Sequence, residues 1–355
     1  MCEAIKQFMS VHRRFTRHAT AFCAILLAIP LSVRAQNSAS KKSSRGQTGG
    51  AGSPRTSLLP RFVPGQTFRY EMEFETTTNT SRSGLASDPQ GPSGLVVDWN
   101  VLVRVDVLPA DASAPGGVVL RTTYEKSAAI VRSDTFDPAA ADTQEQYHRL
   151  EGKVIQFTLD AGGKVSYVSG VESAVESEKA AQSAREWIAQ LSSSAGAPPG
   201  GVSVGQTWSA EQPADSLPIA GMIWRTESEY LRNESCHPAN PDVPAAADSA
   251  TGPHAPADCA VILANLNLVR SKTARDPTSP ELRENGVRSA GKWSGSAQSL
   301  LYVSLASGLV VSVTQTGTEQ MDVTLTSNHN TSMRYAGTVS TRSHVALLAD
   351  DAVGK

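Results

Sequence analysis

The sequence predicts a mostly β protein in which antiparallel sheets form two related halves, with one long amphipathic helix around residues 170–194. Three observations predict this class: strict alternation of apolar and polar residues, a strand start that occurs twice, and one stretch of helical spacing. Alternation with one charged face is typical of an antiparallel sheet that buries only its other face. The chain of 355 residues is long enough for one large β domain or two smaller ones.

Alternating residues mark the expected strands. Every second residue between 97 and 107 is Val or Trp, and between 68 and 74 Phe, Tyr and Met alternate with Arg and Glu. Glu71, Glu73 and Glu75 lie on the polar side of that strand, and we interpret this row of like charges as a solvent-exposed face. Further strands are expected at 118–124, 155–159, 165–167, 222–230, 262–268, 309–313, 321–325 and 333–347.

The helix is predicted by its cap and by its apolar spacing. Ser169 stands three residues before Glu172, which makes a capping box. Gly196 and the prolines at 198 and 199 end the segment. Apolar residues recur at helical spacing between these signals, namely Val171, Ala174, Val175, Ala181, Ala184, Ile188 and Leu191. We expect this apolar stripe to cover an open sheet.

A Gly-Gln-Thr-aromatic motif stands at the start of both halves. It ends in Phe68 at its first occurrence and in Trp208 at its second. This similarity favours a duplicated β module. We expect a first β module with the helix at its C-terminal end over 61–200, and a second over 201–350 with a Pro/Ala-rich loop at 236–259.

The N-terminus has the parts of a secretory signal peptide. A basic region with Arg13 and Arg14 precedes an apolar stretch at 19–33, which is short for a membrane-spanning helix. Small residues at 33 and 35 predict cleavage between Ala35 and Gln36. We expect a signal peptide over 1–35 and a flexible linker over 36–60. An uncleaved N-terminal anchor is the alternative.

The charge balance excludes partners that are recognised by net charge. The chain has 32 Lys and Arg residues against 34 Asp and Glu, a net charge of −2. Removal of the leader takes five basic residues and one acidic residue, which leaves the exported chain at −6. We therefore expect no nucleic-acid partner, and membrane contact only through signal-peptide export. The expected location is periplasmic or extracellular.

Two cysteines remain after the leader is removed, Cys236 and Cys259. In an oxidising compartment two such cysteines most simply form a disulfide, which would close the Pro-rich loop between them. The alternative is a zinc site in which His237 and His254 join the two thiolates. The sequence favours the disulfide, because exported thiols oxidise and adjacent ligands at 236 and 237 are awkward for one metal ion.

No catalytic signature stands out. The sequence contains no Gly-x-Ser-x-Gly motif and no histidine pair at metalloprotease spacing, so we assign no catalytic, cofactor or metal residue. Carboxylates from distant strands could still form the acid pair of a hydrolase. The aromatic residues on or beside strands fill a core or face a ligand, and the candidates for a ligand contact are Trp99, Trp208, Trp224 and Trp293.

The pattern resembles exported β-rich proteins of unknown function that bacteria encode in numbers. The features that carry this resemblance are the signal peptide, the Gly-Gln-Thr-aromatic strand start, Gly291-Lys292-Trp293 and the closing Met333-Arg334-Tyr335. The sheets of such proteins are loosely similar to the half-barrel carriers that move lipoproteins or lipids across the periplasm. The resemblance implies a location in the bacterial envelope and a groove for an apolar ligand, and it assigns no functional residue.

The expected function is that of a non-enzymatic exported binding protein of the bacterial envelope. Its ligand would be apolar or lipid-like and would lie between the sheet and the helix. The alternative is a structural envelope protein that recruits another protein through an exposed strand edge. A carboxylate hydrolase is the third possibility. The identity of the ligand or protein partner and the oligomeric state stay open at this point.

Overall fold

The computed structural model describes the greater part of the chain from residue 55 onward. The described residues are 55–84, 93–109, 117–134, 138–160, 165–174, 198, 200–214, 217–236, 258–272 and 276–348. The expected signal peptide, its cleavage site at Ala35 and Gln36, most of the expected linker and the interior of the loop at 236–259 lie outside the described residues. Residues 175–197, which make up most of the expected helix, lie outside them as well.

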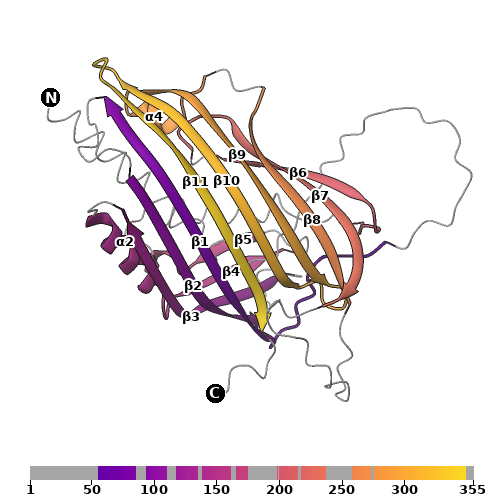
Figure 1. Ribbon diagram of the computed structural model, residues 1–355. Helices are drawn as coiled ribbons and strands as arrows, with labels where there is room; N and C mark the ends of the chain where they lie inside the picture. The colour runs from indigo at the N-terminus through magenta and orange to yellow at the C-terminus, as the bar shows by residue number, and fades with distance from the viewer. Residues whose placement is uncertain are drawn as a thin grey trace, which may run out of the picture.

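A single antiparallel sheet of 11 strands forms the body of the protein (Figure 1). Its order is β5-β4-β3-β2-β1-β11-β10-β9-β8-β7-β6. Strands that follow each other in the chain are neighbours in the sheet, except that β5 and β6 form its two edges, while β1 pairs with β11 at the centre. The first wing contains β1 (Thr67–Gly84), β2 (Ser93–Leu108), β3 (Val118–Ser133), β4 (Val154–Leu159) and β5 (Val165–Ser169). The second wing contains β6 (Thr207–Pro213), β7 (Met222–Ser235), β8 (Asp258–Arg270), β9 (Val287–Ser304), β10 (Val310–Ser327) and β11 (Ser332–Leu348).

The predicted mostly-β class is therefore confirmed, whereas the two expected modules lie within one continuous sheet. The alternation at 68–74 and 97–107 falls on β1 and β2, and all the other expected strands lie in the sheet. Residues 55–60, the end of the expected linker, contact the folded body. Thr56 exchanges two backbone hydrogen bonds with Val202, and Leu58 lies in the core.

The sheet curves toward the face that carries Tyr70, Trp99 and Val313, which we call the inner face. One apolar cluster on this face joins Phe157 and Val168 of the first wing to Val303 of the second. Strands so far apart in one sheet can share a cluster only if the sheet bends around it. Figure 1 shows this bend, since β4 and β5 lie behind the central strands. The largest buried side chains therefore fill the inside of the curve at one end of the sheet.

A second apolar cluster lies at the opposite end of the long strands. Its members come from the ends of β7–β11 that are remote from the first cluster, from the connection between β6 and β7, and from the short helix α4 (Pro280–Glu284). Ser279 caps α4 by accepting a hydrogen bond from the backbone N–H of Leu282, which is itself buried. The members are Ala214, Ile219, Met222, Leu268, Leu282, Val287, Val323, Leu325 and Met333.

The described helices are short. The helix α2 (Pro138–His148) packs against β3, and its Tyr147 reaches the inner face of the first wing. The described part of the expected long helix contains only the 3-10 turn η1 (Val171–Ser173), in which Val171 is fully buried. Its N-cap is Gly170 without a side-chain hydrogen bond, while Ser169, the predicted cap, is the last residue of β5. No helix in the described part of the chain is long and apolar enough to cross a membrane.

The first Gly-Gln-Thr motif forms a tight turn that leads into β1. The backbone N–H of Gln66 donates to the Val63 carbonyl (3.0 Å), and the Gln66 side chain accepts from the Val63 N–H (2.9 Å). Gly65 has a φ of +89° and donates its N–H to the carbonyl of Val107, whose own N–H donates to Gln66. Glycine is required here because L-residues disfavour a positive φ.

The second motif forms the same turn ahead of β6. Gln206 donates its backbone N–H to the Ser203 carbonyl (2.9 Å) and accepts from the Ser203 N–H on its side chain (3.1 Å). Gly205, with a φ of +79°, donates to the carbonyl of Tyr230, and the Tyr230 N–H donates to Gln206. The two motifs thus share their backbone conformation and all four hydrogen bonds. A duplication of the whole module stays a prediction.

Candidate functional site

The inner face between the two clusters carries a strip of smaller side chains, which we call the belt. Residues that pair across neighbouring strands form rows. In the first row of the belt Gly317 of β10 lies between Ala297 of β9 and Thr341 of β11, and in the second row Glu319 lies between Gly295 and Val339. The belt consists of Thr76, Thr78, Leu266, Gly295, Ala297, Gly317, Glu319, Val339 and Thr341. All nine positions are half-buried, whereas the cluster residues on either side of them are buried.

The central residues of the belt are small and lie close together. A Cβ atom at Gly317 would lie 3.1 Å from the Cβ of Ala297 and 3.0 Å from the hydroxyl of Thr341. The row toward the first cluster is also polar and small, since Ser299 is buried and donates its hydroxyl to the Gln315 side chain (3.0 Å). Small side chains therefore line this part of the inner face, in contrast to the large side chains of the two clusters.

Glu319 is the only ionisable side chain of the belt; in the next row toward the second cluster Arg270 of β8, which pairs with Met222, is exposed. The Oε2 of Glu319 accepts a hydrogen bond from the Trp293 Nε1 at 2.8 Å. Burial raises the pKa of Glu319, and the hydrogen bond from Trp293 works in the opposite direction. The described residues offer Glu319 no ion pair with Lys, Arg or His.

Gly295 brings this carboxylate close to a second indole. A Cβ atom at Gly295 would lie 2.8 Å from the Cγ of Glu319 and 3.0 Å from the Cη2 of Trp224. Both side chains therefore lie over the backbone of Gly295, a position that any larger residue would block. Trp224 and Trp293 each contact the second cluster as well, so the cluster holds the two indoles in place.

The four predicted tryptophans all lie on the inner face, but they do not form one group. Trp99 is fully buried, stacks on Phe74 with ring centroids 4.9 Å apart, and donates its Nε1 to Ser127 at 2.9 Å. It is a core residue, and we leave it out of the candidate site. Trp208 is half-buried at the edge of the sheet, and its buried Nε1 has no partner among the described residues.

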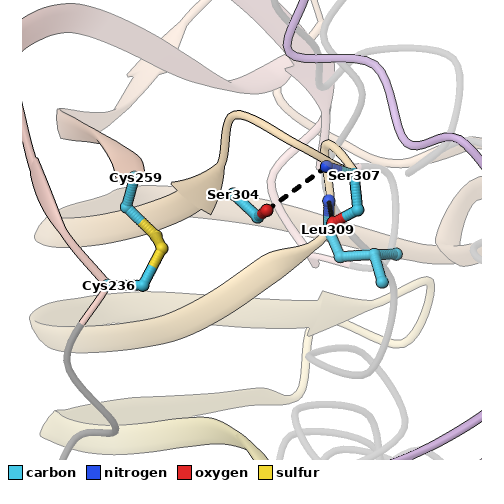
Figure 2. Close-up of a disulfide and its surroundings, with 5 residues drawn as sticks. All are labelled: Cys236, Cys259, Ser304, Ser307 and Leu309. Atoms are coloured by element: carbon cyan, nitrogen blue, oxygen red, sulfur yellow. Dashed lines mark hydrogen bonds between the residues drawn. A yellow bond between two sulfur atoms is a disulfide. The ribbon is translucent and has the colours of Figure 1, made fainter. Parts of the chain in front are cut away.

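The structure contains the disulfide between Cys236 and Cys259 (Figure 2). It joins the end of β7 to the start of β8, with the two Cα atoms 5.0 Å apart, and closes the loop between them. Near it, Ser304 accepts a hydrogen bond from the Ser307 N–H in the β9–β10 turn (Figure 2). A zinc site on these thiolates is thereby excluded in this state. The disulfide fits an oxidising compartment.

The other acidic residues singled out in the sequence lie on the outer face. Glu71, Glu73 and Glu75 are exposed, in agreement with a solvated row of charges. Glu319 lies between the strands expected at 309–313 and 321–325, and nothing in its polar surroundings in the sequence distinguishes that acid from an exposed one. Only the register of β10 against β9 and β11 places it on the inner face. No group of three or more metal-ligating side chains occurs in the described part of the chain.

Comparisons with known proteins give weak structural likenesses and no family. No protein-family model matches the chain, and no curated protein matches it. Lipovitellin, studied for its lipid–protein interactions, matches 81% of this chain with 8% identity and a TM-score of 0.39, and the match spans about a quarter (26%) of the lipovitellin chain. An outer membrane channel from Pseudomonas putida F1 covers 81% of this chain and 97% of its own at 9% identity, with a TM-score of 0.20. DynF of the dynemicin pathway from Micromonospora chersina covers 87% of this chain and 95% of its own at 10% identity, with a TM-score of 0.16.

Proposed function

We propose that this protein is a non-enzymatic exported binding protein that holds an apolar or lipid-like ligand on the belt. The ligand would lie between the inner face and the helix that the sequence predicts around residues 170–194. The observation that carries the proposal is the belt itself, a strip of small half-buried residues between two well-packed apolar clusters on the inside of a curved sheet. Binding sites for small molecules are concave and mostly apolar, with few polar groups.

The chemistry of the belt supports a chain-like apolar ligand. Its aliphatic residues and methyl groups (Leu266, Ala297, Val339, Thr76 and Thr341) line one continuous path from β8 to β1. A ligand on this path would cover side chains that are now half-buried, at a gain of roughly 25 cal/mol for each Å² of apolar area.

A matched pair of variants tests the proposal. Ala297 lies in the belt, while Ser296 is exposed on the outer face, because successive residues of a strand point to opposite faces. Ala297→Phe should abolish binding of dodecyl maltoside, used below its micelle concentration, whereas Ser296→Phe should leave it unchanged. Native mass spectrometry of the chain purified from its own envelope should also show a lipid-sized adduct on the parent protein. Equal binding by both variants would exclude the belt as the site.

An envelope scaffold that acts through a strand edge is the second candidate. One observation favours it: Tyr167 on the edge strand β5 is 61% exposed. The other edge strand, β6, carries Glu211 and ends in Pro213, two features that discourage pairing with a further strand. Cross-linking to an envelope protein that Tyr167→Ala abolishes would favour this function. A hydrolase is supported least, because it needs a second acid near Glu319.

A further inference from the structure

Glu319 is placed where a carboxylate is costly, which calls for an explanation. It is half-buried on the inner face, and its pKa is shifted by burial and by Trp293 alone. The basic residue of the next row, Arg270, is exposed and lies two strands away on β8. Lys292 of the neighbouring strand is exposed on the outer face, where it pairs with Asp322. Arg82, on the same face, stands two rows away and is aligned with Tyr335. A carboxylate removed from water is stabilised only by a counter-charge, by a proton or by several hydrogen bonds.

The surroundings of Glu319 provide part of what a bound cation needs. The Trp293 indole donates one hydrogen bond to Oε2, and the described residues donate none to Oε1. The Trp224 ring and the Glu319 side chain meet over Gly295, so the carboxylate has an indole on either side. The electron-rich faces of indoles attract ammonium groups, and such aromatic surroundings recognise quaternary ammonium ligands.

We propose that Glu319, Trp224 and Trp293 bind the ammonium head group of an amphipathic ligand whose apolar chain lies along the belt. This inference rests on the proposed function, since the belt supplies the site for the chain. An anionic head group is disfavoured because Glu319 would repel it in surroundings that screen charge poorly. An uncharged sugar head group forms neither an ion pair with the carboxylate nor a cation–π contact with the indoles, so it serves as the comparison ligand.

Two probes with the same alkyl chain separate the head group from the chain. Dodecyltrimethylammonium carries the cation, and dodecyl maltoside carries an uncharged head. Both are titrated into the purified full chain below their micelle concentrations, with binding followed by calorimetry. We expect the parent protein to bind the ammonium probe about tenfold more tightly than the maltoside probe, as a cation–π contact and one ion pair together would give.

The variant Glu319→Gln keeps the shape of the side chain and its hydrogen bond from Trp293, but removes the charge. It should lose the preference for the ammonium probe while its affinity for the maltoside probe stays the same. Glu75→Gln removes an exposed acid from the outer face and should change neither affinity, which controls for net charge. Trp293→Phe, which keeps an aromatic ring and loses the hydrogen bond, should reduce the preference about threefold.

The outcomes distinguish this inference from the proposed function. If both probes bind the parent equally well, or if Glu319→Gln retains the ammonium preference, the inference is wrong while binding on the belt stands. If neither probe binds, the proposed function fails, and tetramethylammonium then tests the head-group site alone. Binding of tetramethylammonium to the parent but not to Glu319→Gln would support the head-group site, and no difference between the two would overturn it. Should Glu319→Gln fail to fold, Trp293→Phe decides instead: a preference for the ammonium probe that falls about threefold supports the head-group site, and an unchanged preference overturns it.

Discussion

The two wings of the sheet start with the same turn but place it in different surroundings. At the start of β1 the turn leads into a central strand, and Phe68 is buried against Phe62 and Tyr70. At the start of β6 it leads into an edge strand, and Trp208 stays half-buried. The local sequence determines the turn, whereas the number of neighbouring strands determines how far the aromatic residue is buried.

The two wings also share their order of secondary-structure elements. Each wing runs from the Gly-Gln-Thr turn through three antiparallel strands, a short helix (α2 or α4) and further strands. The inner face of the first wing is filled mainly by large side chains and by Tyr147 of α2, while most residues of the belt lie on the second wing, with only Thr76 and Thr78 on β1. The first wing thus provides much of the apolar core, and the second wing carries most of the proposed site.

The largest effect should come from the tryptophans of the two wings. Trp99→Ala removes a buried indole and its hydrogen bond to Ser127, and should lower the free energy of unfolding by about 4 kcal/mol. Trp208→Ala should cost about 2 kcal/mol, because Trp208 is half-buried and its Nε1 has no partner among the described residues. Urea unfolding of both variants measures the difference. Equal losses would mean that the edge position buries its aromatic residue as fully as the centre.

Much of the first wing could be predicted from the sequence, because its signals are local. The alternation at 97–107 predicts a strand with one buried face, and β2 has that face buried throughout. The pairing of β1 with β11 could not be predicted, since residues such as Met72 and Val345 are joined only by the sheet register. A central pairing of the two ends of the folded chain leaves no short-range pattern in the sequence.

The candidate site was predictable only in part, for the same reason. Trp224 and Trp293 are conspicuous in the sequence, and both lie beside Glu319. Glu319 itself stands between Thr318 and Gln320, in a stretch whose polar residues conceal which face is buried. The helix α2 gave no signal either, because its sequence is largely polar and small and only Tyr147 anchors it in the core.

The second largest effect should come from the disulfide, which the described first wing lacks. Replacing both Cys236 and Cys259 by Ser should lower the free energy of unfolding by about 3 kcal/mol, because the bridge closes a loop of 23 residues. Urea unfolding with and without a reducing agent measures this loss. The reducing agent should destabilise the parent and leave the double variant unchanged. A parent protein that is insensitive to reduction would show that the loop is held by other contacts.

The two turns themselves should respond alike. Gly65→Ala and Gly205→Ala should each cost about 1 kcal/mol, because both positions have a positive φ that alanine disfavours. A Cβ atom at either position meets no atom within 4 Å, so the cost is conformational and not steric. Thermal or urea unfolding gives both values, with Gly200→Ala, where φ is not in the left-handed region, as the control. Losses that differ by more than about twofold would contradict the equivalence of the turns.

The smallest effect should come from two acidic residues on the outer face, one beside each Gly-Gln-Thr turn. Asp106 faces Thr67 in the register of β1 and β2, and Glu229 faces Thr207 at the matching position of β6 and β7. Burial acts to raise the pKa of Asp106, but hydrogen bonds from Arg121 (2.9 Å) and Thr67 (2.9 Å) and nearby guanidinium charge bring it below its ordinary value.

Since the folded-state pKa of Asp106 is lowered, its contribution to stability is present above the unfolded-state pKa of about 4 and is lost as the pH falls through the folded value. Asp106→Asn should therefore lower the free energy of unfolding by about 1 kcal/mol at pH 7. The difference in free energy of unfolding between this variant and the parent should become smaller toward pH 3. Glu229→Gln should be nearly neutral at both pH values, because no hydrogen bond or ion pair reaches Glu229 from the described residues. Urea midpoints of the three proteins at pH 7 and pH 3 measure these differences. A constant gap for Asp106→Asn would show that the variant acts through packing, since only a charge-dependent interaction disappears when the carboxylate takes up its proton.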